Sequence, residues 1–173
     1  MNRMTALSVA VAAVAGLMPV ASNAADAQRQ VEVAGRGKDV MPFSLKATTH
    51  IFTKTHEGGV QRVVAKDVTD AGQTAFVREH LQEIKAQFLK GDFSAPSHIH
   101  GGDMPGLAEL AAAKPGQIAI AYKEVAGGAE LEYKTADHQL VMALHKWFDA
   151  QLSDHGSDAL EGHQHHHPDA PGK

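Results

Sequence analysis

The sequence predicts an α+β domain in which an antiparallel sheet, made of two β-hairpins, carries two long helices on one face. Two observations lead to this fold class. Four short segments are rich in β-branched and aromatic residues, and glycine-containing turns join them in pairs. Each pair is followed by a segment whose apolar residues recur at helical spacing. The order of hairpin, helix, insert, hairpin and helix suggests a ββα unit that occurs twice.

The start of the chain is expected to be a cleaved secretory signal peptide over residues 1–24. Arg3 precedes a short apolar run, and small residues near Ala24 suit a signal peptidase. The run is shorter than the roughly 20 residues of a membrane-spanning helix, so we expect no stable membrane anchor and a periplasmic or secreted mature chain. Residues 25–44 are polar and lack a sustained period, and we interpret them as a linker.

A single domain is expected over residues 45–156. Residues 48–55 and 60–67 read as the two strands of the first hairpin, with His-Glu-Gly-Gly as the turn. Residues 70–90 read as an amphipathic helix that ends before Gly91. The apolar stripe of this helix consists of Val77, Leu81, Ile84 and Phe88.

The second half of the domain begins with a glycine-rich loop and a short helix over residues 107–114. Strands over residues 117–125 and 129–135 form the second hairpin, and residues 136–153 form the second long helix. The apolar stripe of this helix consists of Val141, Leu144, Phe148 and Leu152. Superposing the two helical segments places His80 over His145, so a true duplication would let these histidines approach each other.

The composition limits the chemistry of the protein. Cysteine is absent, which excludes thiolate zinc sites, iron–sulfur clusters and covalently attached haem. The formal net charge of −4 argues against nucleic acid as a partner. The 12 histidines among 173 residues are the strongest compositional signal, and they point to a metal ion as the ligand.

The stretch SHIHGGDMPG, residues 97–106, is the first candidate metal site. In an extended loop His98 and His100 would point to the same side, and Asp103 and Met104 would lie within reach. Imidazole suits copper, zinc and iron, and a thioether favours copper. The alternative is an ordinary glycine-rich turn, with Met104 in the core and both histidines in solvent.

A second set of histidines is expected to face the interior. His80 and His145 lie beside the apolar stripes of their helices, and His50 shares a sheet face with Phe52. His155, at the end of the second helix, can reach the same region. Because burying an unpartnered imidazole is costly, each needs a hydrogen-bond acceptor, a metal or the edge of a cleft. Three carboxylates are candidates for fixing a histidine tautomer, namely Glu79, Asp149 and Asp154.

These residues predict an exported protein that binds a transition metal, and copper is favoured over zinc, iron or haem as the bound group. The candidate ligands are His50, His80, His98, His100, Met104, His145 and His155. No pairing of base and nucleophile stands out, so holding the ion or delivering it to another periplasmic metal-handling protein is favoured over catalysis.

Two alternatives stay open. One is a metal- or haem-dependent enzyme that uses the same histidines, with Asp103 or Glu79 as general base. The other is a metal-free module that binds a small molecule between Phe52, Trp147 and Phe148.

Residues 157–173 are expected to form a disordered, histidine-rich tail. His163 and three consecutive histidines at 165–167 would collect copper, zinc or nickel with low affinity. Such a tail would complicate any measurement on a site in the domain.

Four segments together resemble a family of small exported bacterial proteins that often carry the label aspartate carbamoyltransferase. The segments are MPFSLKATTHIFTKT, VREHL, IHGGDMPGL and ALHKWFDAQLSDHG, and the resemblance covers residues 41–156. It implies a single exported domain. Aspartate carbamoyltransferase activity is not expected, because the Ser-x-Arg-Thr signature that holds carbamoyl phosphate in those enzymes is missing. The positions that match the family pattern are His50, His80, His100, Asp103, Met104, His145 and His155.

Overall fold

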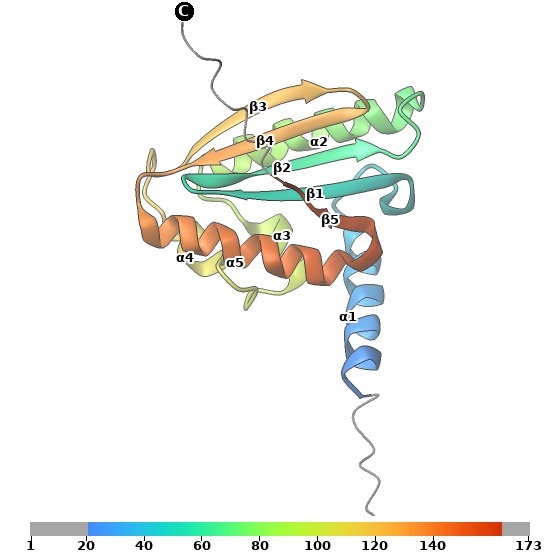
Figure 1. The fold of residues 1–173 in the computed structure, drawn as a ribbon, viewed down its shortest axis with the longest axis horizontal. Coiled ribbons are helices and arrows are strands. Elements are labelled where there is room, and N and C mark those ends of the chain that lie inside the picture. Colours follow the sequence, from blue (N-terminus) through green and yellow to red (C-terminus); the bar gives the residue numbers. More distant parts are fainter. Residues whose placement is uncertain (1–20, 164–173) are drawn as a thin grey trace, which may run out of the picture.

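A computed structural model describes residues 21–163 of the chain. This part contains five α-helices and one five-stranded mixed sheet, which confirms the α+β class (Figure 1). The expected signal peptide lies almost entirely outside the described residues. None of the helices in residues 21–163 has the length and apolar character needed to cross a lipid bilayer.

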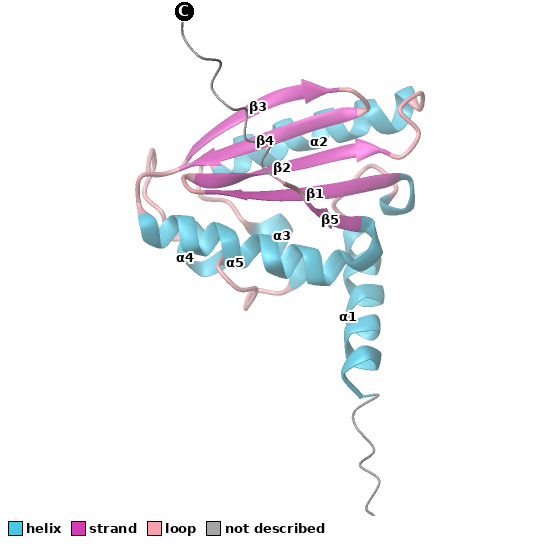
Figure 2. Ribbon diagram, in the orientation of Figure 1, coloured by secondary structure: helices cyan, strands magenta, loops and turns pink. Residues whose placement is uncertain are grey.

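The sheet has the strand order β3-β4-β2-β1-β5 (Figure 2). Its first four strands pair antiparallel and are β1 (Thr48–Thr55), β2 (Gly58–Ala65), β3 (Ala119–Val125) and β4 (Gly128–Lys134). Strand β5 (Ala159–Glu161) pairs parallel with β1. The prediction of a purely antiparallel sheet is therefore wrong.

The parallel strand arises because the chain turns back after the last helix. A short 3-10 helix, Gly156–Asp158, leads from the helix to the sheet edge, where β5 runs beside β1. The backbone N–H of Gly162 donates to the carbonyl of Phe52 and continues this pairing. The first residues of the predicted disordered tail are thus ordered.

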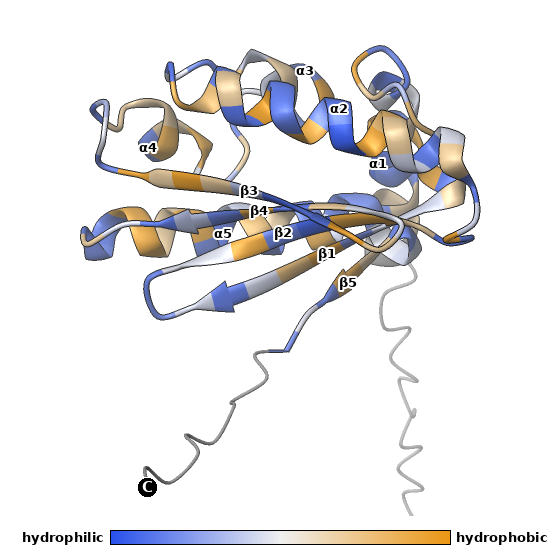
Figure 3. Ribbon diagram, turned by 90° about the horizontal axis from the view of Figure 1, so that it is seen from above, coloured by the Kyte–Doolittle hydropathy of each residue, from blue (hydrophilic) through white to orange (hydrophobic). Residues whose placement is uncertain are grey.

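Both long helices cover the same face of the sheet. Helix α2 (Ala71–Phe88) begins at the cap Asp70, and helix α5 (His138–His155) begins at the cap Asp137. Hydrophobic and hydrophilic residues alternate along α2, whose predicted apolar stripe is buried (Figure 3). The Trp147 ring of α5 lies 5.7 Å from Phe88 of α2 and 5.9 Å from Tyr133 of β4, measured between centroids. One core therefore joins α2, α5 and the sheet.

Two short helices contribute apolar side chains to this core. They are α3 (Ser94–His100) and α4 (Leu107–Ala111). Gly106 precedes α4 with φ of +81°, and a Cβ there would lie 2.1 Å from the carbonyl oxygen of Ala143 in α5. Only glycine allows this backbone approach.

Helix α1 (Ala21–Gly37) occupies much of the segment interpreted as a linker. It projects from the body of the protein, and its later turns lie near α5 and α3 (Figure 1). Val33 is fully buried, and Arg36 donates to the carbonyl of Ile99 at 2.7 Å. The sequence pattern gives no sign of this helix, because polar side chains and one valine fix it, and such contacts leave no apolar period in the sequence.

Candidate functional site

Four histidines from four different elements lie around one cavity of about 40 Å³. They are His50 of β1, His80 of α2, His100 of α3 and His155 of α5. Each side chain is almost fully buried, with exposed fractions between 2% and 9%. A space of this size holds about three water molecules or one ion.

Three of the four imidazole rings contact one another directly. His50 and His155 are stacked, with centroids 4.7 Å apart and planes 7° from parallel. The ring of His100 stands edge-on to His155 at 5.2 Å. His80 is linked to this group through Phe43, whose ring centroid lies 5.8 Å from that of His50 and 5.5 Å from that of His80.

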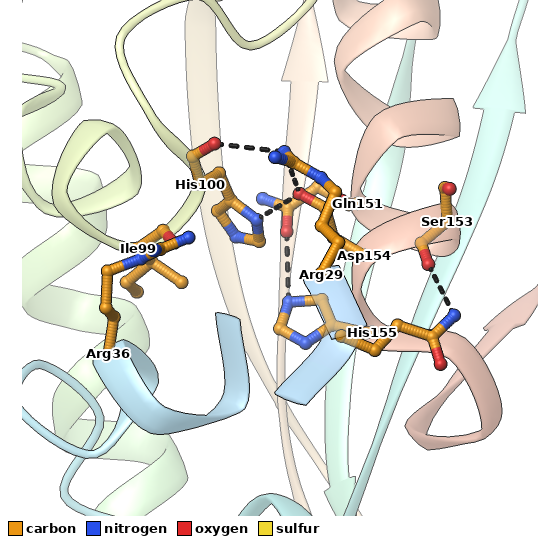
Figure 4. A network of polar contacts seen from close by, with 9 residues as sticks. Arg29, Arg36, Ile99, His100, Gln151, Ser153, Asp154 and His155 are labelled. Carbon is orange, nitrogen blue, oxygen red and sulfur yellow. Dashed lines mark hydrogen bonds and ion pairs between the residues drawn. The ribbon is translucent and has the colours of Figure 1, made fainter. Parts of the chain in front are cut away.

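A buried carboxylate orients His100. Nδ1 of His100 donates to Oδ2 of Asp154 at 2.8 Å, so in the neutral ring the lone pair lies on Nε2 (Figure 4). Arg29 of α1 donates to both oxygens of the same carboxylate and, at 3.0 Å, to the carbonyl of His100. The expectation that Asp154 fixes a histidine tautomer agrees with this geometry. Burial raises the pKa of Asp154, but the hydrogen bonds from His100 and Arg29 outweigh burial and lower it.

Two other imidazoles also have a ring nitrogen to which no neighbouring group donates a hydrogen bond. Nε2 of His155 donates to Oε1 of Gln151 at 3.1 Å, so Nδ1 of this ring is unprotonated (Figure 4). Nδ1 of His50 is buried and has no hydrogen-bond partner. A buried polar atom without a partner costs about 1 to 3 kcal/mol, which a bound ligand can offset.

The surroundings keep these histidines uncharged. Burial lowers the pKa of His80 and of His155 to about 4. Burial lowers the pKa of His50 well below its usual value, and the neighbouring histidines lower it further. Neutral imidazole is the form that binds metal ions, so no proton has to be displaced at neutral pH.

His98 does not join this cluster. The prediction that His98 and His100 point to the same side assumed an extended loop, and it is wrong because both lie in helix α3. Residues two apart in a helix point to nearly opposite sides. His100 is consequently buried, whereas His98 is exposed and lies 3.4 Å from a carboxylate oxygen of Asp39.

Met104 and His145 also lie outside the cavity. Met104 is buried in the core, as in the alternative interpretation of its loop. Nε2 of His145 lies 3.0 Å from the carbonyl oxygen of Thr55 and 2.9 Å from that of Gly58, so this histidine ties α5 to the β1–β2 turn. His80 and His145 do not meet in one cavity, and the duplication stays a prediction.

The remaining candidate residues are dispersed. Glu79 and Asp103 are exposed, and Asp149 pairs with Lys54. Of the predicted small-molecule site, Phe52 and Phe148 pack against each other in the core, 5.1 Å between centroids. Of the tail histidines, His163 is exposed and the others lie outside the described residues.

Three polar residues of the site were not predicted, namely Arg29, Gln61 and Gln151. Gln61 also lines the cavity and accepts a hydrogen bond from the hydroxyl of Tyr133 at 2.8 Å. Gln151 precedes His155 by one helical turn, and this spacing is a signal that the sequence does contain. Nothing in the sequence marks Arg29, because its partners lie more than 70 residues further along the chain.

The cluster is not a ready three-ligand metal centre. Within residues 21–163, no three histidine, aspartate or glutamate side chains are arranged to hold a single metal ion. No known protein family, curated protein or solved structure matches this chain. The function therefore has to be argued from the cavity itself.

Proposed function

We propose that the protein binds one copper ion, in the cuprous state, at the four-histidine cavity, and holds it or passes it to another protein. The single observation that carries this proposal is the convergence of four buried imidazoles, of which at least three are neutral. His100 is the anchoring ligand, because Asp154 orients it with Nε2 free. His50, His80 or His155 supplies the second nitrogen.

The cuprous ion suits this site better than zinc. Zinc takes four ligands in nearly all structural sites and three protein ligands in catalytic ones, and the described residues offer no such set. A cuprous ion is stable between two neutral nitrogen ligands in a linear arrangement. A mainly apolar wall also favours a singly charged ion over a doubly charged one.

Catalysis by the chain alone has little support. The cavity wall contains no serine, threonine or carboxylate that could act as nucleophile. A cavity of about 40 Å³ also has no room for a porphyrin. An exported location is part of the proposal and rests on the amino-acid pattern of residues 1–24.

Competition with a cuprous chelator tests the proposal. The experiment uses the full chain with the four tail histidines, at 163 and 165–167, replaced by asparagine. Copper that the chain takes from the chelator is then bound by the domain and not by the tail histidines. We expect one cuprous ion per chain, and His100→Asn should weaken its affinity at least 100-fold. The matched control is His98→Asn, because this exposed histidine lies two residues away and should leave the affinity unchanged.

Two results would contradict the proposal. One is a chain without tail histidines that fails to compete with the chelator for copper. The other is an equal loss of affinity in the His98 and His100 variants, because that would place the ion outside the cavity.

A further inference from the structure

A second cavity, of about 200 Å³, lies behind the aromatic residues that separate it from the imidazole cluster. Trp147 and Phe88 form part of the wall of both cavities. Phe93 stacks on Phe88 with ring centroids 4.2 Å apart, and Tyr133 completes an aromatic wall. Aliphatic side chains make up much of the rest, namely Leu110, Ile118, Ile120 and Leu144.

The charge at this cavity is opposite to that of the whole chain. Two lysines, Lys90 and Lys114, belong to its lining, and no carboxylate does, although the net charge of the protein is −4. Asp92 is close enough to Lys90 to interact with it. Its pKa is lowered mainly by hydrogen bonds from Ser94 and only slightly by Lys90. Within residues 21–163 neither Lys90 nor Lys114 forms a salt bridge, so both can attract an anion.

Several carbonyl groups at the ends of α2 and α4, beside this cavity, accept backbone hydrogen bonds. The carbonyls of Gln87 and Phe88 accept from the backbone N–H groups of residues 90–92. The carbonyls of Ala108 and Leu110 accept from residues 112 and 113. The indole Nε1 of Trp147 is buried without a partner, and it is a donor only. The unpaired polar group of Trp147 is therefore a donor, which an acceptor on a bound ligand would satisfy.

We infer that this cavity binds a small organic acid with an apolar body, such as an aromatic monocarboxylate. The apolar body would lie against the aromatic wall, and the carboxylate would face the two lysines. The size agrees, because an apolar cavity of about 150 Å³ holds benzene. This inference does not depend on the proposed copper site.

Titration of the full chain with phenylacetate tests the inference, with the fluorescence of Trp147 as the signal. Trp147 is the sole tryptophan of the sequence and lines both this cavity and the imidazole cavity, so the variants below decide which cavity a fluorescence change reports on. The neutral analogue phenylacetamide has the same body without the charge. We expect saturable binding of both, with phenylacetate favoured about tenfold through the two lysines.

Three variants make the test specific. The double variant K90Q/K114Q should lose the preference for the acid and keep the affinity for the amide. K146Q, at an exposed lysine of α5, should change neither. Ile118→Phe should fill the cavity and weaken both ligands, whereas His100→Asn should affect neither.

The inference is overturned if calorimetry and fluorescence both show no saturable binding. It is also overturned if acid and amide bind equally, or if the preference survives in K90Q/K114Q. A preference lost equally in K146Q would point to general surface charge and reject the site as well.

Discussion

Acidification should destabilise the metal-free chain through the two histidines with the pKa of about 4, His80 and His155. In the unfolded chain their pKa returns to about 6.5. Because the folded state has the lower pKa, the unfolded state takes up protons first. The free energy of unfolding therefore falls as the pH drops below about 6.5, and the loss is complete only below about 4.

The size of this effect follows from the two pKa values. Between pH 7.5 and pH 5.5, proton linkage gives a loss of about 1.3 kcal/mol for each histidine, and about 2.7 kcal/mol for the pair. His50 acts in the same direction, because burial lowers its pKa as well. This is a large fraction of the stability of a typical domain.

Urea unfolding at both pH values, in the presence of a chelator, measures the effect. The variants His80→Gln and His155→Gln should each reduce the pH-dependent loss by about 1.3 kcal/mol relative to the parent chain. The exposed His138 provides the control, because His138→Gln should leave the loss unchanged. If His80→Gln and His155→Gln show the full loss of the parent, these imidazoles are not held neutral by burial and the reasoning fails.

Three further predictions concern the site and the core. Asp154→Asn should weaken cuprous ion binding about 10- to 100-fold in the chelator competition, because the His100 imidazole loses its carboxylate acceptor. An unchanged affinity would argue against His100 as the anchoring ligand. Gly106→Ala should lower the free energy of unfolding by about 2 to 4 kcal/mol through the clash with α5, whereas Gly102→Ala, with open space around it, should change it by less than about 0.5 kcal/mol. Phe148→Ala should lower the free energy of unfolding by about 3 to 5 kcal/mol, whereas Phe76→Ala, at a side chain 43% exposed, should lower it by less than about 1 kcal/mol. Similar losses for both variants in urea unfolding would contradict the assignment of the core.

Much of the fold could be predicted because burial on one side leaves a period in the sequence. The alternation in residues 48–55 predicts that His50 and Phe52 share a face, and both are buried. The stripes of α2 and α5 likewise predict which sides meet the sheet, although Leu152 is only partly buried. Segments with one-sided apolar burial are therefore the predictable part.

The site was less predictable because its geometry depends on contacts between distant segments. The HxH motif could not reveal that α3 is helical, since a seven-residue helix carries almost no period of its own. Arg29 was missed for a related reason, because its ion pair with Asp154 joins residues 125 positions apart. His50, His80 and His155 were expected near each other only through the fold class.

The parallel strand β5 has a consequence for how the sheet meets other molecules. It covers β1 along His50–Phe52, so one edge of the sheet is partly blocked by the chain's own backbone. The opposite edge, β3, has no such cover within residues 21–163, and it carries Lys123 and Glu124. Charged residues on an edge strand oppose pairing with a second molecule. Hydrogen bonds to β5 thus protect one edge of the sheet from pairing with another molecule, and charged side chains protect the other. Only the protection by charge weakens as the salt concentration rises.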